Sequence, residues 1–214
     1  MPGDEVLRAV EAALIQRFGA TPARASVSFV GLERLEVLRW RSGAIAWLAT
    51  LGASRHPMSA GDSMHVDPVR GPRAEILVRV RDDGGASAAL VRAMAVVAAS
   101  PAVESMVLRP DATIDLGAAL GPGSRCTGFL LGASDAADVD PGIPGVEPVS
   151  LLEAWPVTAH ELAWARARGA AALRDQLVGE GVDIADLGRR SASLLPAADA
   201  APDPDEPGAG GSGA

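Results

Sequence analysis

The sequence has no lysine and no tyrosine, and Cys126 is the single cysteine among its 214 residues. One cysteine excludes a disulfide framework within the chain and is typical of a reducing compartment. The absence of lysine excludes a Walker-type phosphate loop, and no dinucleotide-binding, nucleophile-elbow or zinc-protease motif is present. The longest apolar run, 44–51, is interrupted by Thr50 and is too short to cross a membrane, and the acidic start of the chain lacks the features of a secretory signal. We therefore expect a cytoplasmic protein.

Basic residues are in the minority, because 19 arginines stand against 27 acidic residues and give a formal net charge of −8. A nucleic-acid-binding protein needs a basic surface to neutralise phosphates. Neither nucleic acid nor a membrane is therefore an expected partner. Residues 196–214 contain no arginine and four acidic residues, and they are rich in proline, glycine and alanine. Because this segment has no large apolar side chain to bury, we predict a folded domain over 1–195 and a disordered tail over 196–214.

Hydrophobic periodicity predicts an α+β domain, in which helices pack on a mixed or antiparallel sheet. The predicted helices cover 4–18, 87–99 and about 159–178. The predicted strands cover 25–30, 35–40, 44–50, 73–81, 104–108, 126–131 and 149–155. The turn between the second and third strands is expected at 41–43.

Four local signals refine this picture. Thr158 and Glu161 have the spacing of a capping box and predict the start of the last helix. Pro101 predicts the end of the second helix, because the residue before a proline disfavours helical backbone. Arg73 and Glu75 alternate with apolar neighbours in 73–81, so we expect both side chains to face solvent. Gly169 predicts either a break in the last helix or close packing against it.

No set of residues assembles a catalytic acid, base and nucleophile. Cys126 lies among apolar residues and is interpreted as a buried structural thiol, although a hydrolase using Cys126 or His56 stays an open alternative. The side chains of His56, Asp62, His65 and Asp67 have irregular spacing that is typical of chance rather than of a metal site. We expect no cofactor and no metal.

Short motifs nevertheless occur in a consistent order over about 6–193. They comprise Trp47, Thr50, Gly52, Ser54, Pro57 and Met58, then Glu75, Thr113, the strand at 126–131, Trp155, Pro156, Glu161, Gly169 and finally Arg189 or Arg190. Together they resemble the suppressor of fused family, and the chain has the single lobe that is typical of bacterial members. In one place the chain departs from the family pattern, because Asp111-Ala112-Thr113 stands where the family carries Gly-His-Thr.

The resemblance implies a non-catalytic protein-binding domain. Bacterial relatives are regarded as immunity proteins that neutralise a partner toxin, and this chain is expected to act in the same way. The alternative is an intracellular regulatory module that binds another protein, such as a transcription factor.

The stretch Ser54-Arg55-His56-Pro57-Met58 is the candidate partner-binding site. It enters a loop that is longer than a hairpin needs, and long loops on a rigid sheet are common sites of recognition. Turn geometry alone accounts for serine and proline in this stretch. It does not account for Arg55 and His56, which we expect to contact the partner.

Overall fold

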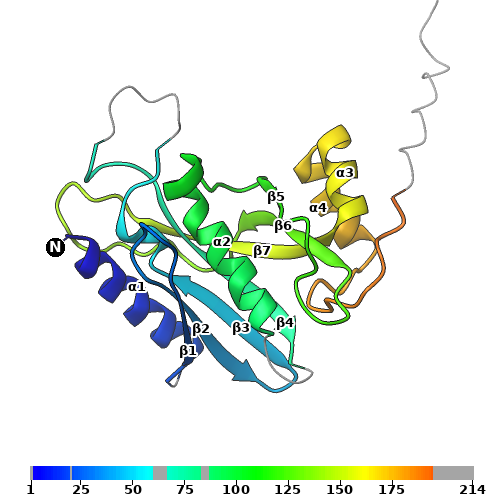
Figure 1. Ribbon diagram of the computed structural model, residues 1–214, viewed down its shortest axis with the longest axis horizontal. Helices are drawn as coiled ribbons and strands as arrows, with labels where there is room; N and C mark the ends of the chain where they lie inside the picture. The colour runs from blue at the N-terminus through cyan, green and yellow to red at the C-terminus, as the bar shows by residue number, and fades with distance from the viewer. Residues whose placement is uncertain (1, 20, 60–66, 83–86, 195–214) are drawn as a thin grey trace, which may run out of the picture.

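A computed structural model of the chain describes residues 2–19, 21–59, 67–82 and 87–194, with seven strands in one sheet of order β1-β2-β3-β4-β7-β6-β5 (Figure 1). Adjacent strands are antiparallel, except that β4 and β7 run parallel. The strands are β1 (Ala23–Val27), β2 (Leu35–Ser42), β3 (Ile45–Leu51), β4 (Arg73–Arg81), β5 (Thr113–Asp115), β6 (Cys126–Ala133) and β7 (Val149–Thr158). The expected α+β class with a mixed sheet is confirmed. The predicted tail, Asp62 and His65 lie outside the described residues.

Helices cover both faces of the sheet, as Figure 1 shows. On one face, α2 (Ala88–Glu104) packs on side chains such as Ile76 and Val78 of β4. On the other face, α1 (Pro2–Phe18) packs on Leu77, while α3 (Ala159–Arg168) and α4 (Ala170–Gly179) pack on Leu130 of β6. A short 3₁₀ turn, η1 (Ala53–Arg55), follows β3 beside the first turns of α1.

The central position of β4 overturns the expectation that Arg73 and Glu75 face solvent. Arg73 is 3% exposed and Glu75 is fully buried. Strand β4 pairs with β3 on one side and β7 on the other, and its two faces are covered by α2 and by α1 with η1. Alternation along one strand shows which side chains share a face, but not whether a helix covers that face.

Several element boundaries also differ from the predictions. Strand β1 covers 23–27 rather than 25–30. The hairpin turn lies at Gly43 and Ala44 rather than at 41–43, because Ser42 pairs with Ile45. Residues 105–108 form no strand, whereas β5 pairs Thr113 with Leu130 at the sheet edge and was not predicted.

Helix α2 continues past Pro101, where the sequence predicted its end. Pro101 has no N–H to donate to the carbonyl of Val97, but the Ser100 hydroxyl donates to that oxygen at 2.7 Å. The last predicted helix is two helices, because Gly169 breaks it with a φ of 97°. The capping box is confirmed, since Thr158 and Glu161 exchange side-chain and backbone hydrogen bonds.

Candidate functional site

A buried carboxylate holds the turn that carries the candidate residues. Oε1 of Glu75 accepts hydrogen bonds from the amide of Gly52 at 2.8 Å and from the amide and hydroxyl of Ser54 at 2.9 and 2.6 Å. Its Oε2 accepts from the hydroxyl of Thr50 at 2.6 Å. Gly52 has a φ of 138°, which a side chain rarely allows. Glu75 therefore fixes the backbone from the end of β3 through η1.

A buried guanidinium completes this scaffold from the same strand. Arg73 donates to the carbonyls of Ser54 and Arg55 at 2.7 and 2.8 Å, and to the carbonyl of Val69 at 3.0 Å. Burial lowers the pKa of Arg73 below its usual value, while the nearby carboxylate of Glu147 acts in the opposite direction. Within the described residues no carboxylate lies within ion-pair distance of Arg73, so its charge is stabilised mainly by main-chain carbonyls.

The five candidate partner-binding residues separate into buried and accessible ones. Ser54 is fully buried and Met58 is 6% exposed, so neither is available for contact in this conformation. Arg55 is half-buried, and its guanidinium forms ion pairs with Asp4 of α1 and with Glu33, so it has a structural role that the sequence did not indicate.

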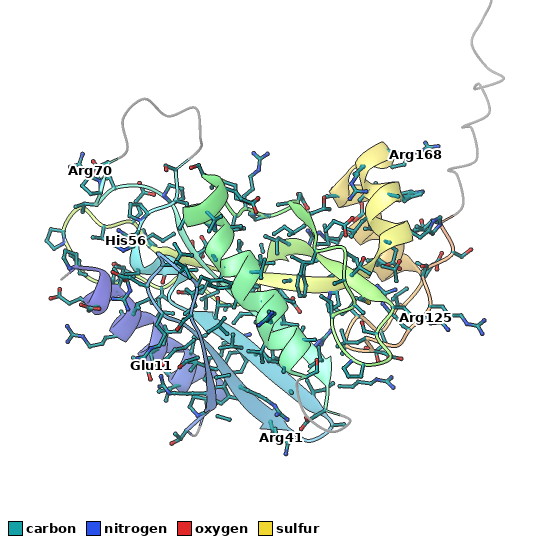
Figure 2. All side chains as sticks on the ribbon, viewed as in Figure 1. Glu11, Arg41, His56, Arg70, Arg125 and Arg168 are labelled. Atoms are coloured by element: carbon teal, nitrogen blue, oxygen red, sulfur yellow. The ribbon has the colours of Figure 1, made fainter. Side chains whose placement is uncertain are left out.

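His56 and Pro57 form the accessible part of the stretch. The His56 side chain is 65% exposed, with Nε2 at 3.7 Å from the Glu33 carboxylate. Pro57 is partly exposed. Figure 2 shows His56 beside the start of α1, at the opposite end of the molecule from Arg125 and Arg168.

Arg55, His56 and Pro57 border a groove with a volume of about 360 Å³, here called the α2 groove. Its other side is formed by the loop before β2 and by the last turns of α2. Its lining includes Leu32, Glu33, Leu35, Ala98, Ala99, Pro101, Ala102 and Ser105. Sequence reasoning missed the residues of α2 and of the loop, because they come from segments far from residues 54–58 along the chain.

A second buried charge cluster joins α3 to the C-terminal segment. The guanidinium of Arg189 donates to both oxygens of Glu161, at 2.6 and 2.8 Å, and to the carbonyl of Pro156 at 3.0 Å. Glu161 also accepts from the amides of Thr158 and Ala192, at 2.8 and 2.9 Å. Burial acts to raise the pKa of Glu161, but these hydrogen bonds and the charge of Arg189 outweigh burial and hold it below its usual value.

The final basic motif position falls on Arg189 or Arg190, and these two side chains differ in burial. Arg189 is 9% exposed and pairs with Glu161, whereas Arg190 is exposed. Two adjacent arginines cannot be distinguished by sequence pattern when only one of them points inward. Of the two, Arg189 makes the buried ion pair.

The remaining motif residues lie away from the α2 groove. Trp47 on β3 and Trp155 on β7 are each partly buried under an arginine guanidinium. Thr113 lies on the edge strand β5, and Gly169 is the exposed break between α3 and α4. These positions shape the sheet and its helices, and they do not converge with Glu75.

Cys126 lies in the main core and is fully buried. Burial raises the pKa of its thiol to about 11, so the reactive thiolate is scarce at neutral pH. Over the described ranges, no three His, Cys, Asp or Glu side chains lie together as metal ligands. In the same part of the chain no helix is long and apolar enough to cross a membrane.

A family profile described as Suppressor of fused protein (SUFU) matches residues 31–190, which span both buried charge clusters. The chain belongs to the suppressor of fused family. No curated protein matches its sequence. The family therefore rests on the profile and on the ordered motifs, and the comparison of folds agrees with both.

Solved structures of this family share the fold at low sequence identity. A suppressor of fused homologue from Neisseria gonorrhoeae superposes with a TM-score of 0.62 at 14% identity, covering 87% of this chain and 96% of that one. A chain of a Sufu–Fu complex gives 0.62 at 12% identity, covering 87% and 91%. Drosophila Suppressor of Fused gives 0.62 at 13% identity, and the match covers 87% of this chain but only 50% of the Drosophila chain.

Proposed function

We propose that this suppressor of fused family member is a non-catalytic protein-binding domain and that the α2 groove binds its partner. The observation that carries the proposal is that accessible side chains border the groove and follow a turn whose backbone is held in place by buried hydrogen bonds. His56 and Pro57 are accessible, while Glu75 and Arg73 hold the backbone of the preceding turn from inside the sheet. Recognition residues are commonly presented by loops on a rigid scaffold, because little conformational entropy is then lost on binding.

The chemistry of the described side chains favours binding over catalysis. A hydrolase using Cys126 would need an accessible, ionised thiol, but this thiol is fully buried and its pKa is raised to about 11. To activate a side-chain nucleophile, His56 would need a thiol or a hydroxyl beside it. The ionic neighbour of His56 is Glu33, and among the described residues no cysteine thiol or serine hydroxyl is hydrogen-bonded to it.

The proposed partner is a protein, and we favour a toxin that the chain neutralises as an immunity protein in the bacterial cytoplasm. One related structure is a Sufu–Fu complex, which supports a protein as the partner. A net charge of −8 favours association with a basic protein through electrostatic steering. The second candidate is regulation of another intracellular protein, which the Sufu–Fu complex supports equally.

The test begins with the partner, recovered by affinity capture on the full chain from its source cells and then purified. Titration calorimetry compares the wild-type chain with His56→Ala and with Ala102→Arg, which places a long side chain in the groove from an exposed position of α2. Ala163→Arg, at an exposed position of α3, is the matched control.

We expect each groove variant to weaken binding by at least about 1 kcal/mol, or about fivefold in Kd, at an unchanged melting temperature. Arg55→Glu is unsuitable, because it would place a third carboxylate beside Asp4 and Glu33. A chain truncated after residue 195 should bind as the full chain does.

Unchanged affinity of both groove variants would contradict the proposed site, and catalytic turnover lost in Cys126→Ala would contradict the proposed function. Loss of the partner's toxicity on binding would separate immunity from regulation.

A further inference from the structure

The C-terminal end of α2 carries negative charge that no described group balances. A helix leaves its last carbonyls without donors, and the partial charge at this end is negative. In α1, α3 and α4 the amide of the residue after the helix donates to a carbonyl of the last turn. Within the described ranges no side chain, and no amide outside the helix, donates to the last turn of α2. That turn contains Glu104 and no basic residue, whereas α1 and α3 end in turns with arginine.

Two local features of this helix end oppose stability. The Glu104 carboxylate is exposed and forms no ion pair or hydrogen bond with another described residue. It adds negative charge where a positive one would be favourable. Ser105 follows with a φ of 51°, in the left-handed region where helices usually end on glycine. Departures from local stability rules are typical of functional sites.

This end of α2 borders the α2 groove. Pro101 and Ser105 line the groove, and Glu104 lies one turn after Pro101 on the same side of the helix. Two exposed valines stand beside the groove. Val103 in the last turn is 64% exposed, and the fully exposed Val30 directly precedes the part of the loop that lines the groove. The groove therefore has apolar surroundings and a negative end.

The positive charge on the opposite side of the groove is already balanced. The Arg55 guanidinium forms ion pairs with Asp4 and with Glu33. Among the described lining residues the other basic side chain is His56, which lies beside the same Glu33 carboxylate. The charge that is left for a partner to neutralise is negative, and it comes from Glu104 and from the last carbonyls of α2.

We propose that the α2 groove recognises a partner segment in which a leucine-like apolar side chain stands next to a lysine or an arginine. The apolar side chain enters the groove beside Val30 and Val103, and the cation donates to the last carbonyls of α2 and pairs with Glu104. Lysine and arginine favour helix C-termini, because their N–H groups can donate to the open carbonyls. This inference rests on the proposed function, and it names the chemistry by which the groove selects its partner.

Two short peptides test this chemistry without the partner. Heteronuclear NMR follows the full chain as it is titrated with acetyl-Leu-Arg-amide or acetyl-Leu-Gln-amide up to about 10 mM, well above the Kd of about 1 mM of a weak complex. We expect saturable shifts of the amides at 30–35 and 98–105. The arginine peptide should bind at least about threefold more tightly at low salt, and this advantage should shrink with added salt because exposed charges are screened.

Matched variants locate the charge that selects arginine. Glu104→Gln should remove most of the preference, whereas Asp175→Asn, which removes the same charge from an exposed position of α4, should keep it. Because the Glu104 carboxylate opposes the helix dipole, Glu104→Gln should melt no lower than the wild type, so its effect is separate from unfolding. Val30→Ser should weaken both peptides alike, since they share the apolar side chain. Equal binding of the two peptides, an arginine preference unchanged in Glu104→Gln, or no shift in these segments would overturn the proposal.

The purified partner separates this inference from the proposed function. Glu104→Arg should weaken its binding at least about fivefold, while Asp175→Arg should leave it unchanged. If His56→Ala and Ala102→Arg weaken binding but Glu104→Arg does not, the inference about charge is wrong and the proposed site stands. If none of these three variants changes the affinity, both the proposed site and this inference are overturned.

Discussion

Replacing Glu75 with alanine removes the acceptor for the backbone that leaves β3. The amides of Gly52 and Ser54 and the hydroxyls of Thr50 and Ser54 all donate to this carboxylate, at 2.6 to 2.9 Å. The hydroxyls can rotate toward other acceptors, but the two amides are fixed by the turn. A buried donor without a partner costs about 1–3 kcal/mol, so two amides give about 2–6 kcal/mol. This is a large part of the stability of a typical domain, about 5–15 kcal/mol.

Urea unfolding followed by circular dichroism measures this loss in the free energy of unfolding. Glu75→Gln keeps a carbonyl oxygen for the two amides but leaves one hydroxyl without an acceptor. We therefore expect Glu75→Gln to lose about 1–3 kcal/mol, less than Glu75→Ala. Glu153→Ala, on the neighbouring strand β7, is the control and should stay within about 0.5 kcal/mol of the wild type. A Glu75→Ala chain as stable as this control would refute the role assigned to the carboxylate.

Three further predictions concern α3 and the core. Because the pKa of Glu161 in the folded chain lies below its usual value of 4.5, the stability that this carboxylate contributes is complete above pH 4.5 and is lost as the pH falls further. Arg189→Met should cost about 3–5 kcal/mol in urea unfolding at pH 7 and should remove most of this acid dependence of the stability. An acid profile that Arg189→Met leaves unchanged would contradict this prediction. Cys126 should resist thiol reagents in the native chain and react only after denaturation, since its thiol is buried with a pKa of about 11; rapid native labelling would contradict this. Thr158→Ala should cost about 1 kcal/mol in thermal unfolding by removing the N-cap of α3, and a value near zero would refute that cap.

Local signals in the sequence predicted the elements whose causes are local. The capping box at Thr158 and Glu161 is complete within four residues, so its pattern suffices to place the start of α3. Pro101 misled the prediction because the compensating Ser100 hydroxyl bond depends on a side-chain rotamer rather than on a residue pattern. The prediction that Arg73 faces solvent was wrong because burial of β4 depends on strands and helices that are distant along the chain.

The candidate site was predictable only in part, for the same reason. His56 is accessible, as its polar character in a turn suggested, whereas Ser54 and Met58 point inward. The ion pairs of Arg55 involve partners from α1 and from the loop before β2, and the far side of the groove belongs to α2. Pattern within one segment cannot reveal such contacts.

Hydrogen–deuterium exchange of the chain with and without its purified partner tests the central claim most directly. If the partner binds in the α2 groove, amide protection should rise in the loop at 29–35, at 52–57 and over the last turns of α2, at 98–105. The amides of β5, at the far edge of the sheet, and of α4, on the other face of the sheet, should exchange as they do in the free chain. Protection confined to β5 and α4, with none in the three groove segments, would contradict the account.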